Sequence, residues 1–164
     1  MRYLLDTNIF IQARNLHYGF DFCPAFWDWL AAQNAAGVVG SIDRVADELT
    51  DDDLSAWATA QSEGFFVPAD DSVIPALGQV AAWANGQAYE RAAISTFFQV
   101  ADYWLVAHAL ARGCTVVTHE VPAETVRKIK IPNACVGLGI ACINPYDMLR
   151  RERARFVLPT PAAQ

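Results

Sequence analysis

Four acidic residues stand where the ends of expected strands and helices could bring carboxylates together. Asp6 directly follows the apolar run "YLL", and Glu120 comes two residues after "CTVVT". Asp102 lies in the first turn of a long expected helix, and Glu48 lies near the end of another. Ligands of parallel α/β sheets gather at the carboxyl ends of the strands. Four converging carboxylates would select Mg²⁺ or Mn²⁺, which can support phosphodiester hydrolysis.

Each of these positions also has an ordinary structural explanation. An acid in a first helical turn, such as Asp102, gains roughly 0.3–1 kcal/mol from the helix dipole. Thr7 or Asn8 could cap a helix that begins at Ile9. Glu48, near a helix C-terminus, is poorly placed for the dipole, which mildly favours another role. Spacing alone therefore leaves both explanations open.

The elements that would position these acids alternate between strands and helices. Short apolar or β-branched runs predict strands, and apolar residues at helical spacing with caps and glycine stops predict helices. Expected strands cover residues 3–5, 38–42, 114–118 and 139–143, with 65–67 a strand or packed loop and 128–131 strand-like. Expected helices cover 9–14, 24–37, 41–49, 52–63, 71–83, 89–97, 99–112 and 122–127, with a turn or short helix after Pro132 and a last helix capped by Asn144. The alternation predicts a parallel sheet covered by helices on both faces.

Length and composition indicate one soluble domain. The chain has 164 residues, of which 54% are apolar and 18% charged. No apolar run approaches the roughly 18–20 residues that a membrane span requires, and the N-terminus lacks a secretory pattern, so we expect a cytoplasmic protein. We expect a domain over residues 1–153 and a disordered tail over 154–164. The four cysteines form no CxxC pair, which favours reduced thiols: Cys23, Cys114, Cys135 and Cys142.

The charge is distributed unevenly along the chain. The net charge is -6, yet residues 1–100 hold 13 acids and 4 bases whereas residues 101–164 hold 5 acids and 8 bases. Basic residues between 127 and 155 could contact phosphates or an acidic partner, or form a solvated helix face. Arg14, Arg127 and Lys128 are the candidate substrate-binding residues. His119 is a candidate general base, although a loop histidine is more often simply solvated.

Six aromatic residues crowd into twelve positions of the first third of the chain. Such density can stack on unpaired bases, but it more often builds a core or a dimer interface, which is the explanation we favour. They are Tyr18, Phe20, Phe22, Phe26, Trp27 and Trp29.

Taken together, the motifs resemble those of the PIN domain family, a metal-dependent nuclease fold common among toxins of bacterial toxin–antitoxin pairs. The resemblance covers about residues 2–150 and rests on "YLLDTN", "SIDRVADELT" with Glu48, "ADYWLVAHALARG" with Asp102, and "VVTHE". The family more often has Asp where this chain has Glu120. The segments "LLDTNIFIQARNLHYGFDFCPAFWDWL" and "IKIPNACVGLGIACINPYDMLR" also resemble a bacterial PIN subfamily.

The resemblance implies a three-layer α/β/α sandwich with a central parallel sheet of four or five strands. It further implies that the four acids bind Mg²⁺ or Mn²⁺ and catalyse RNA cleavage, while Asn8 and Thr118 orient carboxylates or water. The implied protein is an endoribonuclease toxin that binds an antitoxin and forms a homodimer. The metal-binding and catalytic acids are then Asp6, Glu48, Asp102 and Glu120.

Two alternatives stay open at this point. One is a non-catalytic PIN-like module that binds protein or RNA, favoured by Glu120 in place of Asp. The other is a receiver-type or phosphatase α/β domain that uses Asp6 as a phospho-acceptor. The second alternative lacks an aspartate two residues after Asp6 and a lysine at the end of a later strand.

Overall fold

A single parallel sheet of five strands organises the protein. The computed structural model describes residues 1–157. The strand order is β3-β2-β1-β4-β5, and every neighbouring pair is parallel. The strands are β1 (Tyr3–Leu5), β2 (Val39–Ile42), β3 (Phe66–Val67), β4 (Thr115–Val117) and β5 (Cys142–Ile143). Of the tail expected over 154–164, residues 158–164 lie outside the described part.

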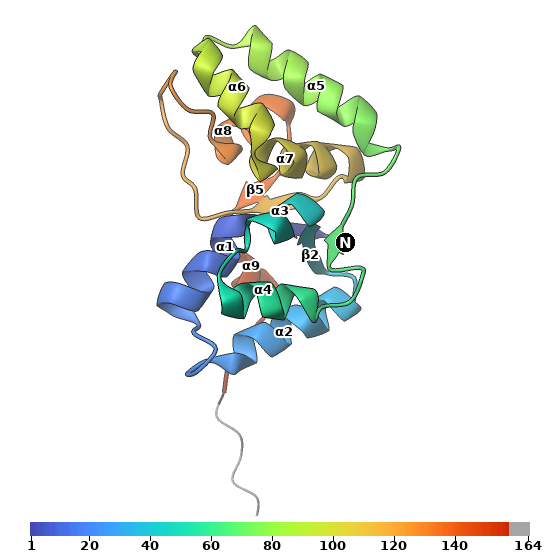
Figure 1. Ribbon diagram of the computed structural model, residues 1–164, viewed down its shortest axis with the longest axis vertical. Helices are drawn as coiled ribbons and strands as arrows, with labels where there is room; N and C mark the ends of the chain where they lie inside the picture. Colours follow the sequence, from blue (N-terminus) through green and yellow to red (C-terminus); the bar gives the residue numbers. More distant parts are fainter. Residues whose placement is uncertain (158–164) are drawn as a thin grey trace, which may run out of the picture.

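Helices cover both faces of this sheet. The helices α5, α6, α7 and α8 lie on one side, and α1, α2, α4 and α9 lie on the other (Figure 1). Right-handed crossovers between parallel strands place the helices in this way, because the chain changes direction after β3. The three-layer α/β/α sandwich with a parallel sheet confirms the predicted fold class. The helices are α1 (Thr7–Gln12), the π-helix η1 (Ala13–His17), α2 (Pro24–Ala35), α3 (Asp43–Glu48), α4 (Asp52–Thr59), α5 (Val73–Gly86), α6 (Arg91–Gln99), α7 (Ala101–Arg112), α8 (Ile131–Leu138) and α9 (Pro145–Arg151).

The pairing of β1 with β4 decides where a site can form. From β1 the chain proceeds outward through β2 to β3 and then crosses back to β4 on the other side of β1. Leu5 lies opposite Val117 in the register, so the two strands end together. The carboxyl ends of strands at such a reversal of order form the ligand-binding crevice of open α/β sheets. Receiver-type domains have the order 2-1-3-4-5, so the receiver-type form of that alternative is wrong, whereas the strand order does not test the phosphatase-type form.

Local sequence signals account for several of the elements. All three residues of β1 are buried, as expected for a strand covered on both faces. Gly113 ends α7 in the left-handed conformation, with φ of 65°, which glycine adopts without a steric penalty. The side chain of Asn144 caps α9 by accepting a hydrogen bond from the N–H of Asp147 at 2.9 Å. The predicted end of α7 and start of α9 are confirmed.

The segment 122–131 differs from the prediction of a helix followed by a strand. Residues 122–130 form a loop, and Ile131 begins α8. Ile129 and Ile131 are buried, and the lysines beside them are more exposed. Buried and exposed residues therefore alternate as they would in a strand, although the segment pairs with no strand in the described chain. The side chain of Asn133 holds the loop by bonding both the N–H and the C=O of Ala123, at 3.0 and 3.2 Å.

The aromatic residues of the first third pack mainly into the core beneath the sheet. The rings of Tyr18 and Phe26 stack with centroids 4.3 Å apart, and those of Phe20 and Trp27 stack at 4.1 Å. Phe156 packs edge-on against Phe26 with centroids 5.9 Å apart, so the described part of the expected tail contacts the domain. The structural explanation of this aromatic-rich segment is confirmed.

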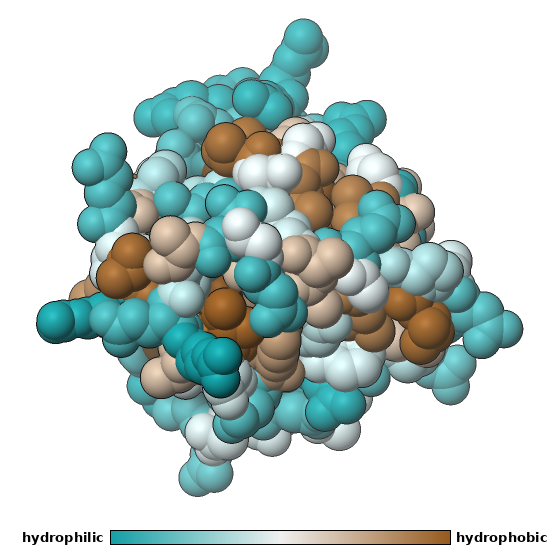
Figure 2. All heavy atoms as spheres, turned by 90° about the horizontal axis from the view of Figure 1, so that it is seen from above, coloured by the Kyte–Doolittle hydropathy of each residue, from teal (hydrophilic) through white to brown (hydrophobic). Residues whose placement is uncertain are grey.

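All four cysteines are free thiols. Among residues 1–157, no helix combines the length and apolarity that a membrane crossing requires. Seen from above α5 and α6, the surface mixes hydrophilic side chains with separate hydrophobic groups (Figure 2). The homodimer stays a prediction.

Candidate functional site

Asp6 is placed at the carboxyl end of β1 by the sheet itself. Its N–H donates to the carbonyl of Val117 at 3.0 Å, so the ladder continues one residue beyond the strand. Asp6 then stands at the N-cap position of α1, but its side chain makes no cap hydrogen bond. The side chain is directed into the crevice instead, where Oδ2 accepts a hydrogen bond from the Thr118 hydroxyl at 2.7 Å. With 3% of its surface exposed, Asp6 is an unusually buried carboxylate.

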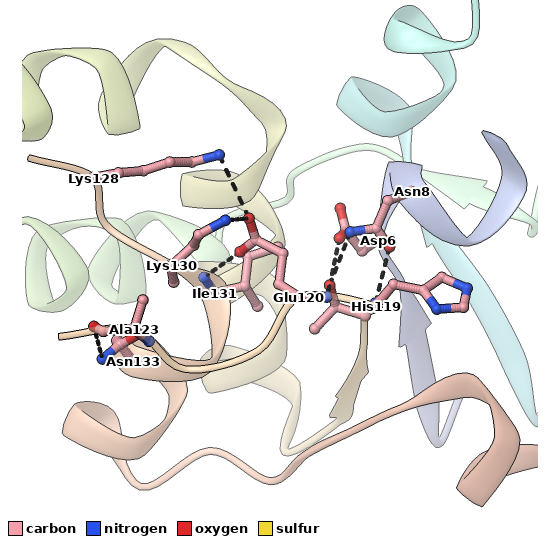
Figure 3. Close-up of polar contacts among 10 residues, drawn as sticks. Asp6, Asn8, His119, Glu120, Ala123, Lys128, Lys130, Ile131 and Asn133 are labelled. Carbon is pink, nitrogen blue, oxygen red and sulfur yellow. Dashed lines mark hydrogen bonds and ion pairs between the residues drawn. The ribbon is translucent and has the colours of Figure 1, made fainter. Parts of the chain in front are cut away.

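Thr118 and Asn8 fix the orientation of that carboxylate. The Thr118 hydroxyl donates to Asp6 and accepts from the Asn8 amide at 3.1 Å and from the Glu120 N–H at 2.9 Å. It thereby uses its one proton and both lone pairs. The Asn8 carbonyl in turn accepts the N–H of His119 at 3.0 Å (Figure 3). The structure thus brings Asn8, Thr118 and Asp6 together in one network, and Asn8 does not serve as a cap of α1.

Glu48 connects the beginnings of two helices. Its Oε2 accepts a hydrogen bond from the Thr7 hydroxyl at 2.5 Å, and its Oε1 accepts one from the N–H of Ala101 at 3.1 Å. Thr7 directly follows Asp6, and Ala101 directly precedes Asp102. The Glu48 carboxylate at the end of α3 therefore holds the starts of α1 and α7, next to Asp6 and Asp102. Contact with the positive N-terminal end of α7 also explains how an acid is tolerated at the C-terminal end of α3.

Asp102 lies half-buried in the first turn of α7 and faces the other acids. No donor within residues 1–157 forms a hydrogen bond to its carboxylate. Burial, followed by the charges of Glu120 and Glu48, raises its pKa to about 6. Lys128 and Lys130 act in the opposite direction. Without a cation, part of this carboxyl stays protonated at pH values where an exposed aspartate is already fully ionised.

The same effects act more strongly on Asp6. Burial is the largest cause and the charge of Asp102 the next, and together they raise the pKa of Asp6 to about 7. The hydrogen bond from Thr118 acts against this shift. Two carboxylates that repel each other in a buried crevice are a frequent feature of functional sites.

The sequence predicts that the Glu120 side chain lies beside Asp6, but the structure places it elsewhere. Its side chain extends toward α8 and away from Asp6 (Figure 3). Oε1 accepts a hydrogen bond from Lys130 Nζ at 2.7 Å and lies 3.6 Å from Lys128 Nζ. Oε2 accepts the N–H of Ile131, the first residue of α8, at 2.9 Å. Within residues 1–157, no group of three or more His, Cys, Asp or Glu side chains forms a ready ligand set.

A pocket of about 430 Å³ opens beside these acids. Glu48 and Asp102 line it together with Arg127 and Lys128, two of the three predicted substrate-binding residues. Arg14, the third, lies outside this pocket and forms ion pairs with Asp51 and Asp53 at 3.2 and 2.9 Å. Thr96 and five apolar residues complete the lining: Ala92, Ala93, Phe97, Val100 and Ile129. The pocket thus combines acids, bases and an apolar surface.

Several residues of the site could not be found from the sequence. Thr7 gave only a capping signal, and Lys130 lay in an expected strand. His119, the candidate general base of the sequence analysis, stacks on His17 with centroids 5.6 Å apart, and the Tyr146 hydroxyl lies 3.1 Å from His17 Nε2. These three rings come from segments far apart in the chain, so no local pattern indicates their meeting.

The fold and the acids at the β1–β4 crevice define a three-layer α/β/α protein with acidic side chains at the carboxyl edge of its parallel sheet. The chain belongs to the family described as "Domain of unknown function (DUF4411)", whose model matches residues 3–156. Its structure is similar to the crystal structure of FitAcB from Neisseria gonorrhoeae, with a TM-score of 0.52 and 20% sequence identity. The similarity covers 88% of this chain and 98% of that chain and concerns the fold. No curated protein matches the sequence.

Proposed function

We propose that this protein is a Mg²⁺- or Mn²⁺-dependent endoribonuclease and the toxin of a type II toxin–antitoxin pair. The observation that carries the proposal is the placement of Asp6 and Asp102. They come from different elements and share the crevice at the carboxyl ends of β1 and β4, where burial and then the charge of Asp102 raise the pKa of Asp6. Repelling buried carboxylates are costly unless a cation compensates them.

The donors of the crevice suit a hard divalent cation. Within residues 1–157, one carboxylate oxygen of Asp6 accepts no side-chain hydrogen bond, and Asp102 accepts no hydrogen bond at all. Mg²⁺ is commonly bound through one or two carboxylates and keeps several waters, so Asp6 and Asp102 would hold it, with Glu48 close by. A bound cation of this kind supplies an activated water and offsets charge that develops on the phosphate.

The remaining residues would hold the acids and the substrate in place. Thr118 fixes the Asp6 carboxylate, and Glu48 fixes the starts of α1 and α7. Arg127 and Lys128, on the pocket wall, would bind backbone phosphates of RNA. Their position offsets, at the site itself, the net charge of -6 that is otherwise unfavourable for an RNA-binding protein.

Cleavage of a structured RNA by the purified protein tests this function. With Mn²⁺, the wild-type chain should cut the RNA, and Asp6→Asn should not. Asp28→Asn is the matched control, because Asp28 is exposed on α2 and forms no ion pair within residues 1–157. Equal cleavage by wild type and Asp6→Asn, or none by either across several RNAs, would contradict the nuclease. In growing bacteria, wild type but not Asp6→Asn should arrest growth.

The non-catalytic PIN-like module stays the second candidate, and one observation favours it. Both oxygens of Glu120 are engaged, by Lys130 and by the N–H of Ile131, and its side chain is directed away from Asp6 (Figure 3). A module of this kind would bind RNA or protein without cleavage, and Asp6→Asn would leave binding unchanged. The same two variants therefore separate the two candidates.

A further inference from the structure

Both lysines of the chain face the same carboxylate. The sequence contains ten arginines and only two lysines, Lys128 and Lys130. Lys130 Nζ lies 2.7 Å from Glu120 Oε1, and Lys128 Nζ lies 3.6 Å from the same oxygen. An ammonium group is a compact point charge, whereas a guanidinium is a planar fork. The two compact cations of the protein are thus placed together, beside the crevice that holds Asp6 and Asp102.

Glu120 is fully occupied by this arrangement. One oxygen accepts a charged hydrogen bond from Lys130 and the other accepts the first N–H of α8, and only 12% of the side chain is exposed. Hydrogen bonds to ionised groups are roughly twice as strong as neutral ones. To bind an ion beside Asp6, Glu120 would have to leave both partners and turn away from α8.

The loop backbone that carries the two lysines is held by contacts with neighbouring elements. Lys130 is the N-cap residue of α8 and is followed by the buried Ile131. The loop before it is fixed at Ala123 by Asn133 and at Val126, whose carbonyl accepts the N–H of Glu90 at 2.8 Å. The Lys130 ammonium, with 26% of its side chain exposed, therefore has a defined place beside Glu120, whereas the Lys128 side chain is 61% exposed.

We propose that the Lys130 ammonium, held by Glu120, stands where a second divalent ion would otherwise be needed. The site then binds one divalent ion, at Asp6 and Asp102, and Lys130 and Lys128 supply the remaining positive charge to a substrate phosphate. Glu120 is a positioning residue for Lys130 in this arrangement and does not bind the ion. The inference rests on the proposed metal-dependent function and specifies the number of ions and the residue that replaces one of them.

The number of bound ions can be measured by titrating the full chain with Mn²⁺ alone. Binding is detected by calorimetry or by the electron paramagnetic resonance signal of free Mn²⁺. Wild type should bind one ion. Asp102→Asn should lose most of this binding, while Glu120→Gln should still bind one ion, with an affinity within about threefold of wild type. Two ions in wild type and one in Glu120→Gln would overturn this inference but leave the nuclease proposal standing. Binding of no ion would overturn both.

A second measurement addresses the role of Lys130 directly and does not depend on Glu120 variants. Binding of single-stranded RNA, measured by fluorescence anisotropy in EDTA, should weaken about tenfold in Lys130→Met. The slope of log affinity against log salt should fall by about 1, as expected for the loss of one phosphate contact. Arg151→Met, an exposed charge on α9, is the control and should change binding little. Equal binding by Lys130→Met and Arg151→Met would overturn the proposal.

Discussion

Asp6→Asn is expected to make the metal-free protein more stable at alkaline pH, although it removes a site residue. Burial raises the pKa of Asp6 from 3.8 to about 7, and the Asp102 charge contributes further. A carboxyl with a raised pKa binds protons more tightly in the folded chain than in the unfolded chain. The free energy of unfolding therefore falls as the pH rises from about 4 through 7. Above pH 7 the whole destabilisation by the ionised Asp6 carboxylate is present.

The size of the effect follows from this pKa difference. At 1.36 kcal/mol for each pKa unit, the ionised Asp6 costs about 4 kcal/mol at pH 8 in the absence of a cation. Asn has nearly the same shape and carries no charge, so the variant should recover up to this amount. Near pH 4 the carboxyl is protonated in the folded chain, and the two proteins should differ little.

Urea denaturation in EDTA at pH 8 and at pH 4.5 measures the difference, with Asp28→Asn as the control for loss of an exposed acid. Mn²⁺ should stabilise wild type at pH 8 and leave Asp6→Asn unaffected, because ligands that bind only the folded state raise its stability. A variant that is less stable than wild type at pH 8 without metal would refute the explanation. So would a stability difference that is the same at both pH values.

Three further substitutions test the surroundings of the site. Thr118→Val removes the hydroxyl that orients Asp6, and Mn²⁺ affinity in calorimetry should fall about 10–100-fold; an unchanged affinity would contradict the role of the network. Glu48→Gln should lower RNA cleavage by a similar factor, since the starts of α1 and α7 lose their shared carboxylate, and full activity would exclude this role. His108→Leu should raise the free energy of unfolding by about 1–3 kcal/mol at pH 7, because both ring nitrogens are buried without a partner in the described chain. The gain should grow as the pH falls from 6.5 toward 4, since burial lowers the pKa of His108 to about 4 and the unfolded histidine takes up a proton first; a gain that shrinks over this range would contradict the burial of a neutral ring.

The sequence by itself determined the fold class and the location of the crevice. Alternating strands and helices require a covered parallel sheet, and a carboxylate directly after "YLL" must stand at a strand end. Gly113 and Asn144 likewise fix helix boundaries through their own backbone and side-chain preferences. These features depend on neighbours within a few residues, which periodicity and cap chemistry describe well.

Only the tertiary structure decided how the acids are used. The Glu48 carboxylate accepts hydrogen bonds from the Thr7 hydroxyl and from the N–H of Ala101, which are 41 and 53 positions away in the sequence. No local pattern predicts these two contacts. The alternation of Ile129 with the flanking lysines predicted a strand, but burial of one face of a loop produces the same pattern. Because that loop leads into α8, a lysine and a helix N-terminus reach Glu120 and turn it away from Asp6. The direction of a side chain depends on which partners the fold brings within reach, and this is information that the order of residues does not contain locally.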